Sequence, residues 1–294
     1  MTDETPPTEA GRIAAFFDLD KTVIAKSSVL AFSRPFFDQG LLNRRTVIEN
    51  TYAQFLYLLS GADHDQAQRM RAYIAAMCEG WNVEQIKSIV AETLHEIVDP
   101  LVFQEAADLI ADHKLRGHDV VVISASGEEV VTPIAEALGA SHSTASRMRI
   151  VDGRYAGELE FYCFGEEKVT AMKELAERYG YDLARSYAYS DSSTDIPMLQ
   201  AVGYPRAVNP DRALRRVAAE RGWPVLTFVK PVPLLRRLTI RGRGLLTVGM
   251  IVSATALLAG AATYSALRRR RWIGAGHQRE SARKWGLADP GNRG

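Results

Sequence analysis

Short apolar runs that stop abruptly at polar residues recur along this chain. The first, at residues 14–17, is followed by Asp18 and Asp20, a second, within residues 118–124, ends in Ser-Ala-Ser, and a third, within residues 185–190, ends at Asp191. Short runs rich in aliphatic and aromatic residues indicate buried strands. Ligands of open α/β sheets bind beyond the carboxyl ends of the strands, so the polar residues that follow these runs are candidates for a site.

Helical patterns separate the predicted strands. A β-hairpin with its turn at Asp152-Gly153 is expected within residues 145–164, and short strands are expected at residues 207–208 and 224–228. The alternation of strand and helix predicts an α/β fold with a doubly wound parallel sheet. The helices expected between these strands span residues 128–138, 166–179, 196–199 and 212–221.

A long stretch without any strand signal separates the first two predicted strands. Apolar residues recur there at helical spacing, for example within residues 47–59, and Asn82 and Asp99-Pro100 are placed to begin further helices. We therefore expect an insertion of several helices, residues 26–110, between two parts of the core, residues 12–25 and 111–230.

Composition narrows the classes of function. The 294 residues include 36 Lys and Arg against 35 Asp and Glu, a formal net charge of +1, which argues against a general nucleic-acid binder. Cys78 and Cys163 lack metal-type spacing and are interpreted as reduced thiols of a cytosolic domain. Residues 1–11 are polar, contain two prolines and show no signal peptide, so a disordered N-terminus is expected.

The C-terminal part predicts a membrane anchor. Residues 245–267 carry no charge and would span about 34 Å as a helix, which suffices for the hydrocarbon core. The alternative is a hydrophobic helix that packs on a partner or lies at the interface. Arginines flank the segment on both sides, within a basic linker (residues 231–244) and a basic, disordered tail (residues 268–294).

This anchor would make the protein a single-pass protein of the cell membrane. Since the predicted core has no export signal, it is expected to face the cytoplasm, although the flanking arginines leave the orientation by charge ambiguous. Small residues recur along one stripe of the segment and could pair two helices in a homodimer, or could simply reflect composition. The stripe consists of Gly249, Ser253, Ala256 and Gly260.

The first strand end carries the clearest chemical signal. Alternation along a strand puts Asp18 and Asp20 on the same side, where two carboxylates repel unless a cation or a proton intervenes. This pair suggests a Mg²⁺ site, in which one carboxylate acts as nucleophile and the other as acid and base. The alternative is that both are ordinary turn aspartates.

Four signals in one order resemble a known family. They are Asp18-Leu19-Asp20-Lys21-Thr22, Ser124, Lys168 and Asp191 with Asp195, each at a strand end or a helix start. The set resembles the haloacid dehalogenase (HAD) superfamily of phosphotransferases. The helical insertion after the first motif resembles the C1-capped subfamily IB, near the phosphoserine phosphatases. The resemblance covers about residues 12–228 and implies a Rossmann-like HAD core with a helical C1 cap.

The resemblance implies a role for each motif residue. Asp18 would be the nucleophile that forms an aspartyl-phosphate, and Asp20 the general acid and base. Ser124 would bind the phosphoryl oxygens, and Lys168 would neutralise charge on Asp18 and the phosphate.

The family also implies a metal ion. Mg²⁺ would be bound by the Asp18 side chain, the Asp20 backbone carbonyl and Asp191, while Asp195 would orient Lys168 or a metal-bound water. Taken singly, each of these residues is more simply explained without a function: Ser124 as a turn hydroxyl, Lys168 as a solvated helix lysine, and Asp191 and Asp195 as helix caps.

The substrate is less defined by the sequence. The glutamate with which phosphoserine phosphatases hold the substrate ammonium has no counterpart within residues 25–28, where a lysine stands instead. Lys26, Ser27, Ser28 and Arg34 could meet an anionic or polyol head group, or be surface residues of a helix start. We therefore expect a Mg²⁺-dependent phosphomonoester hydrolase that acts on a small phosphorylated metabolite. The alternatives are a phosphotransferase to an alcohol and a non-catalytic membrane scaffold that binds a phosphate ligand.

Overall fold

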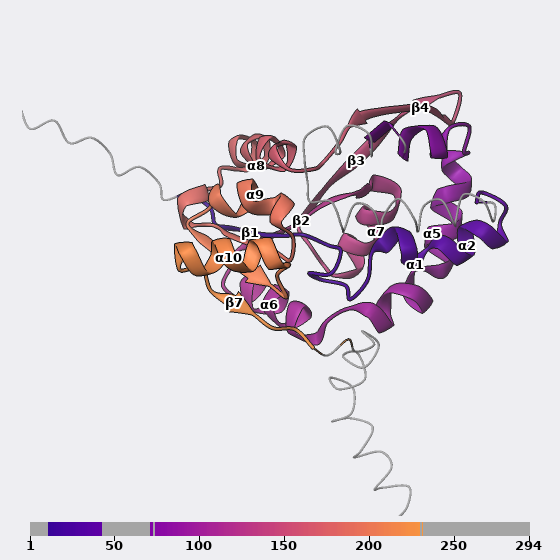
Figure 1. Ribbon diagram of the computed structural model, residues 1–294. Coiled ribbons are helices and arrows are strands. Elements are labelled where there is room, and N and C mark those ends of the chain that lie inside the picture. Colours follow the sequence, from indigo (N-terminus) through magenta and orange to yellow (C-terminus); the bar gives the residue numbers. More distant parts are fainter. Residues whose placement is uncertain (1–10, 43–70, 73, 230, 232–294) are drawn as a thin grey trace, which may run out of the picture. The chain divides into compact units, whose positions relative to one another are not determined.

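The computed structural model describes residues 11–42, 71, 72, 74–229 and 231. Their centre is a seven-stranded sheet in the order β4-β3-β2-β1-β5-β6-β7 (Figure 1). The strands are β1 (Ala14–Phe17), β2 (Asp119–Gly127), β3 (His142–Val151), β4 (Arg154–Phe161), β5 (Tyr187–Ser190), β6 (Tyr204–Val208) and β7 (Val225–Leu226).

The sheet confirms the predicted α/β class. All neighbouring strands pair in parallel except β3 and β4, which form the expected antiparallel hairpin. In the centre, Phe17 of β1 lies between Val122 of β2 and Tyr189 of β5. The ends of these three strands therefore reach the same edge of the sheet, and the chain that follows each of them converges there.

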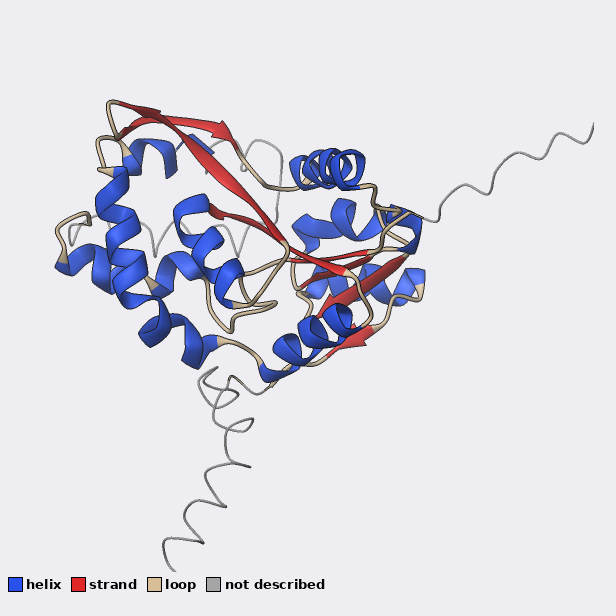
Figure 2. Cartoon of the chain, turned by 180° about the vertical axis from the view of Figure 1, so that it is seen from behind, coloured by secondary structure: helices blue, strands red, loops and turns tan. Residues whose placement is uncertain are grey.

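The short strand β1 is buried on both faces, as expected for a central parallel strand. Ala15 and Phe17 join one hydrophobic cluster, and Ala14 and Phe16 join the other. The first cluster includes residues of α6 (Gln104–Leu115) and α7 (Glu128–Ala137). The second includes residues of α8 (Glu166–Tyr179), α9 (Ile196–Gln200) and α10 (Arg212–Arg221). Helices thus cover both faces of the sheet (Figure 2).

The insertion after β1 is helical where the structure describes it. It contains α1 (Ser28–Ala31), α2 (Ser33–Asp38), α5 (Val83–Val98) and the 3-10 helix η1 (Asp99–Leu101), with no strand among the described residues between β1 and β2. The Asn82 side chain caps α5 by accepting a hydrogen bond from Gln85 N at 2.9 Å, as its position predicted. The helix expected within residues 47–59 lies outside the described residues.

Some boundaries differ from those expected. The expected bound at residue 111 between the insertion and the core falls inside α6, which runs from Gln104 to Leu115 as one helix. β2 continues past Ser124 to Gly127, because β3 still pairs with it there. β7 is shorter than expected, since only Val225 and Leu226 pair with β6.

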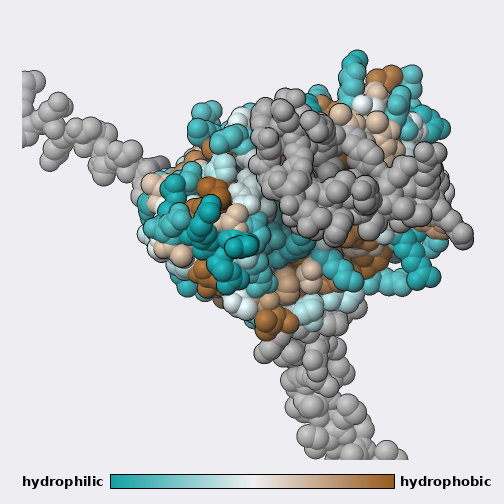
Figure 3. Space-filling model, viewed as in Figure 1, coloured by the Kyte–Doolittle hydropathy of each residue, from teal (hydrophilic) through white to brown (hydrophobic). Residues whose placement is uncertain are grey.

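Several predicted segments lie outside the described residues. These are the N-terminus up to residue 10, nearly all of the basic linker, the apolar segment 245–267 and the tail. None of the helices in the described ranges has both the length and the apolar character needed to span a membrane. Figure 3 shows hydrophilic and hydrophobic residues intermixed on the described part of one face.

Candidate active site

Asp18 and Asp20 lie in a tight turn that leaves the carboxyl end of β1. The backbone N–H of Asp18 donates to Tyr189 O of β5 at 2.9 Å, which extends the strand pairing to the first carboxylate. The chain then folds back, with the N–H groups of Val23 and Ile24 both donating to Leu19 O. Lys21 has a φ of 60° in this turn, a backbone conformation that only a minority of non-glycine residues adopt.

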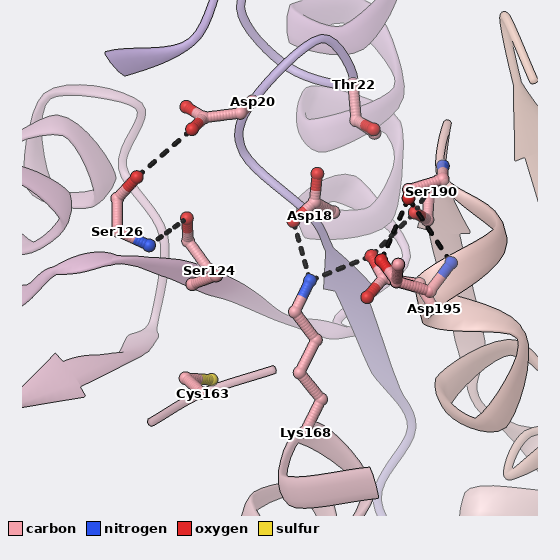
Figure 4. Close-up of polar contacts among 12 residues, drawn as sticks. Asp18, Asp20, Thr22, Ser124, Ser126, Cys163, Lys168, Ser190 and Asp195 are labelled. Atoms are coloured by element: carbon pink, nitrogen blue, oxygen red, sulfur yellow. Dashed lines mark hydrogen bonds and ion pairs between the residues drawn. The ribbon is translucent and has the colours of Figure 1, made fainter. Parts of the chain in front are cut away.

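A buried lysine joins two of the predicted site residues (Figure 4). Lys168 Nζ lies 2.7 Å from Asp18 Oδ1 and 2.8 Å from Asp195 Oδ2, and the lysine side chain is only 3% exposed. Lys168 lies in the first turn of α8. The helix begins directly after Gly165, whose φ of 57° is in the region that favours glycine. Asp18 and Asp195 lie 150 and 27 positions from Lys168 in the sequence, and both contact its ammonium group.

The loop after β5 holds Asp195 through hydroxyl groups. Ser190 Oγ donates to Asp195 Oδ2 at 2.7 Å and accepts from Ser192 N at 3.2 Å. These two contacts fix the Asp195 carboxylate relative to the end of β5. Ser190 is a site residue that the sequence analysis did not assign a role.

Asp191 is the first residue after β5. Thr22 Oγ1 donates to Asp191 Oδ1 at 3.4 Å, which connects the β1 turn to this loop. Burial raises the pKa of Asp191 to about 7 and Asp195 adds to this shift, while Lys21 and Lys168 oppose it. The structure thus brings Asp18, Asp191, Asp195 and Lys168 into one site at the carboxyl edge of the sheet.

The charges of this site do not balance within the protein. Burial raises the pKa of Asp18 well above its usual value, Lys168 opposes the shift, and Asp195 and Asp191 add to it. Although burial alone would lower the pKa of Lys168, Asp18 and Asp195 raise it, so the ammonium stays charged. One buried cation faces three carboxyl groups, and a further cation would relieve the excess of negative charge.

The oxygen donors of this site are of the kind that Mg²⁺ uses. Among the described residues, no group of three or more His, Cys, Asp or Glu side chains is arranged to hold a metal ion. Mg²⁺ usually binds one or two carboxylates and keeps several waters and substrate oxygens. Asp18 and Asp191, with the backbone carbonyl of Asp20, are residues that could hold it in this way.

Asp20 points away from the lysine, toward Ser126 of β2 (Figure 4). Its carboxylate accepts from Ser28 N at 2.8 Å, from Ser126 Oγ at 3.1 Å and from Ser27 Oγ at 3.5 Å. Burial raises the pKa of Asp20, and the hydrogen bonds from Ser28 and Ser126 oppose this shift. Asp18 and Asp20 are therefore two carboxyl groups of one turn with different partners.

Ser124 lies buried on β2, beside the Asp18 turn. Its Oγ accepts from Ser126 N at 3.2 Å, and Ser146 Oγ of β3 donates to Ala125 O at 2.7 Å, which ties the end of β2 to β3. The sequence analysis gave Ser126 no role. Its signal was the Ser-Ala-Ser spacing, because alternation along a strand places both serines on one side.

The four residues predicted to meet a substrate head group do not converge. Ser27 and Ser28 are buried and their groups contact Asp20, whereas Lys26 is exposed. The Arg34 side chain is 90% exposed and pairs with Asp38 at 3.8 Å. A surface cavity of about 370 Å³ between α9, β6 and the end of α10 includes none of the predicted site residues.

Comparison with known proteins gives a consistent family. The family model described as haloacid dehalogenase-like hydrolase matches residues 15–200, which include every motif residue above. A Mycobacterium tuberculosis protein named probable phosphatase is 60% identical over 272 residues, 90% of this chain and 95% of that protein.

Two more distant proteins are also similar to this chain. Phosphoserine phosphatase SerB1 of Mycobacterium tuberculosis is 34% identical over 231 residues, 77% of this chain and 74% of that protein. The crystal structure of a Bordetella pertussis protein of unknown function superposes with a TM-score of 0.65 at 28% identity, covering 74% of this chain and 98% of that one.

Proposed function

The chain belongs to the haloacid dehalogenase-like hydrolase family, and on that basis we propose that it is a Mg²⁺-dependent phosphatase that acts through a phosphorylated Asp18. The observation that carries this proposal is the contact of Lys168 Nζ with both Asp18 and Asp195 inside a buried site. A carboxylate held next to an ammonium group at the carboxyl edge of a parallel sheet is placed to attack an incoming phosphate ester.

The residues suggest a reaction in two halves. In the first, an Asp18 oxygen attacks phosphorus, the bond to the ester oxygen breaks, and protonated Asp20 gives its proton to the departing alcohol. In the second, Asp20 takes a proton from water, which attacks the phosphorus of the aspartyl-phosphate and releases inorganic phosphate and free Asp18. Lys168 and the hydroxyl of Ser124 offset charge on the phosphoryl oxygens.

A divalent cation fits the acidic part of this site. Mg²⁺ bound by Asp18, Asp191 and the Asp20 carbonyl would supply positive charge to the phosphoryl oxygens. Asp195 keeps Lys168 beside Asp18, because its Oδ2 accepts from Lys168 Nζ at 2.8 Å. Ser190 Oγ donates to the same oxygen at 2.7 Å and holds it in place. Asp195 therefore acts on the nucleophile through the lysine.

The proposed substrate is a phosphate ester of a small alcohol. One relative is named phosphoserine phosphatase, but this chain has no acidic residue within residues 25–28 to hold an ammonium group there. We therefore propose phosphoserine as one candidate among alcohol phosphates. The membrane anchor at residues 245–267, its cytoplasmic orientation and the homodimer remain predictions, because that segment lies outside the described residues.

The test is hydrolysis of an aryl phosphate by the full chain, with and without Mg²⁺. We expect release of inorganic phosphate that EDTA abolishes and added Mg²⁺ restores. Competing alcohols in the same assay distinguish hydrolysis from transfer, since a phosphotransferase would yield the new phosphate ester in place of phosphate. Binding of aryl phosphate without any turnover would instead favour a non-catalytic scaffold and contradict the proposal.

A further inference from the structure

The Asp20 carboxylate is held by serines from two distant parts of the chain. Ser126 belongs to β2 in the core, and Ser28 begins α1 in the helical insertion, 98 residues away. Ser126 Oγ donates to Asp20 Oδ2 at 3.1 Å, and Ser28 N donates to Asp20 Oδ1 at 2.8 Å. Each carboxylate oxygen thus has its own donor, which fixes both the position and the rotation of the group.

The two serine hydroxyls also contact each other. Ser28 Oγ donates to Ser126 Oγ at 2.8 Å, so the hydroxyl protons run in one direction, from Ser28 to Ser126 to Asp20. A hydroxyl has a single proton to donate, and Ser126 uses it on Asp20 because its oxygen accepts from Ser28. Ser28 and Ser126 are 0% and 8% exposed, so water has little access to compete for these bonds.

We propose that Ser126, supported by the hydroxyl of Ser28, is a positioning residue that sets where Asp20 delivers and receives its proton. The Ser126 hydroxyl contacts Asp20 and Ser28, whereas the contact with Ser124 comes from the Ser126 backbone N–H, which Ser126→Ala would keep. The inference rests on the proposed function, since it assigns Asp20 the proton transfers of that reaction. It adds a second serine of the Ser-Ala-Ser segment to the machinery, with a role different from that of Ser124.

The consequence depends on the leaving group. A good leaving group such as p-nitrophenolate departs with little help from an acid, whereas an alkoxide needs the proton. General acid catalysis contributes about 10²–10⁴-fold in rate, and proton transfer requires donor and acceptor at hydrogen-bond distance. Removing the Ser126 hydroxyl leaves Asp20 in place but less well oriented, so the loss should grow as the leaving group becomes poorer.

The experiment measures kcat/KM for a series of substituted phenyl phosphates and one alkyl phosphate with the full chain and Mg²⁺. kcat/KM is used because it reports the steps up to release of the alcohol, before Asp20 acts as a base. For Ser126→Ala we expect a loss below about threefold with p-nitrophenyl phosphate and about tenfold or more with the alkyl phosphate. Ser28→Ala keeps its N–H donor to Asp20, so the same trend should be weaker.

Four further variants separate positioning from a merely structural role. Ser126→Thr keeps a hydroxyl and should restore the shallow dependence on leaving group. Asp20→Asn should already show the steep dependence, and adding Ser126→Ala to it should change the slope little, because the two residues act as one unit. Ser186→Ala is the matched control, since Ser186 is a fully buried serine whose Oγ accepts from Ala14 N at the far end of β1.

The outcomes separate the two proposals. A loss in Ser126→Ala that is equal across the whole series, or that adds in full to Asp20→Asn, would overturn the positioning role and leave the phosphatase proposal intact. Absence of turnover in the unmodified chain, with every phosphate tested, would overturn the proposed function and this inference with it. Thermal unfolding of each variant checks that the fold is retained.

Discussion

The two ends of β1 handle buried polar groups in opposite ways. At the amino end, Asp119 of β2 lies beside Ala14, and its carboxylate contacts Arg12 at 2.6 Å and the Tyr181 hydroxyl at 2.8 Å. At the carboxyl end, Asp18, Asp191 and Asp195 share one buried ammonium. Polar groups at the first end are satisfied by the chain itself, whereas the carboxyl groups at the second end outnumber the one buried ammonium, and a bound cation or protons would offset the excess of negative charge.

The polar groups at the amino end of β1 thus stabilise the fold, and those at its carboxyl end form the candidate site, although the strand has only four residues. Ser186, like Asp119, is hydrogen-bonded by neighbouring groups of the chain, since its Oγ accepts from Ala14 N at 3.0 Å and donates to Asp182 O at 2.7 Å. A hydroxyl at the carboxyl end, such as that of Ser190, instead supports a charged residue of the site. Similar residue types therefore serve the fold at one edge of the sheet and the chemistry at the other.

The largest expected effect is the difference in activity between two variants, each of which removes one carboxylate charge, one at each end of β1. Asp18→Asn should reduce aryl phosphate turnover by about 10³-fold or more, because an amide is a poor nucleophile. Asp119→Asn should change kcat less than about threefold and lower the free energy of unfolding by about 1–2 kcal/mol, because it weakens the contacts with Arg12 and Tyr181. Phosphate release and urea unfolding of both variants check this, and equal activity losses would contradict the contrast.

A second effect concerns a closed polar cluster beside β5. His113 Nε2 lies 2.8 Å from the Tyr189 hydroxyl and its Nδ1 lies 2.9 Å from His118 Nδ1. Burial lowers the pKa of His113 to about 4, with His118 adding to the shift. Between pH 6.5 and 4 the unfolded chain therefore protonates this residue while the folded chain does not, so stability is lost as the pH falls through that window.

The loss should reach up to about 3 kcal/mol at the acid end of the window. Urea unfolding at several pH values measures it, and His113→Gln should flatten this part of the profile. His95→Gln is the control, since the His95 side chain is 71% exposed. A profile that His113→Gln leaves unchanged would show that the cluster is not held neutral by the fold.

A smaller effect is the stabilisation of the fold by Mg²⁺, which should depend on the carboxyl end of β1 and not on its amino end. Mg²⁺ at a hundredfold excess over its dissociation constant should raise the free energy of unfolding by about 2–3 kcal/mol, since only the folded chain assembles the site. Asp191→Asn should remove most of this gain, whereas Asp119→Asn should keep it. Thermal shifts with and without Mg²⁺ measure both, and stabilisation of Asp191→Asn equal to that of the unmodified chain would contradict the predicted metal site.

Sequence patterns predicted the core and the strand ends well, for a physical reason. Central parallel strands are buried on both faces, so they appear as apolar runs, and β1, β2 and β5 are found where those runs lie. The helix predicted at residues 166–179 matches α8 in both bounds because Gly165 and Gly180 flank it. Pairing was harder to predict, since the extension of β2 to Gly127 depends on β3.

In the candidate site, too, residues at strand ends and helix starts could be predicted, whereas contacts between distant segments could not. Asp18, Lys168, Asp191 and Asp195 stood out because each follows a strand or begins a helix, and the structure brings them together. The bond between the Ser28 and Ser126 hydroxyls could not be read from the sequence, because it joins residues 98 positions apart. Lys26 and Arg34 were placed near the substrate by proximity to the motif alone, while α1 turns Ser28 inward and leaves Val29 and Leu30 exposed.

The most direct test of the central claim is to identify the residue that receives the phosphoryl group. Acid quenching during turnover of an aryl phosphate, followed by mass spectrometry of peptides, should place phosphate on the peptide that contains Asp18. Asp18→Asn should carry none, and Asp119→Asn should carry as much as the unmodified chain. Turnover without any phosphate on that peptide, or phosphate on a different residue, would contradict the claim that the carboxyl end of β1 is the reacting end of the sheet.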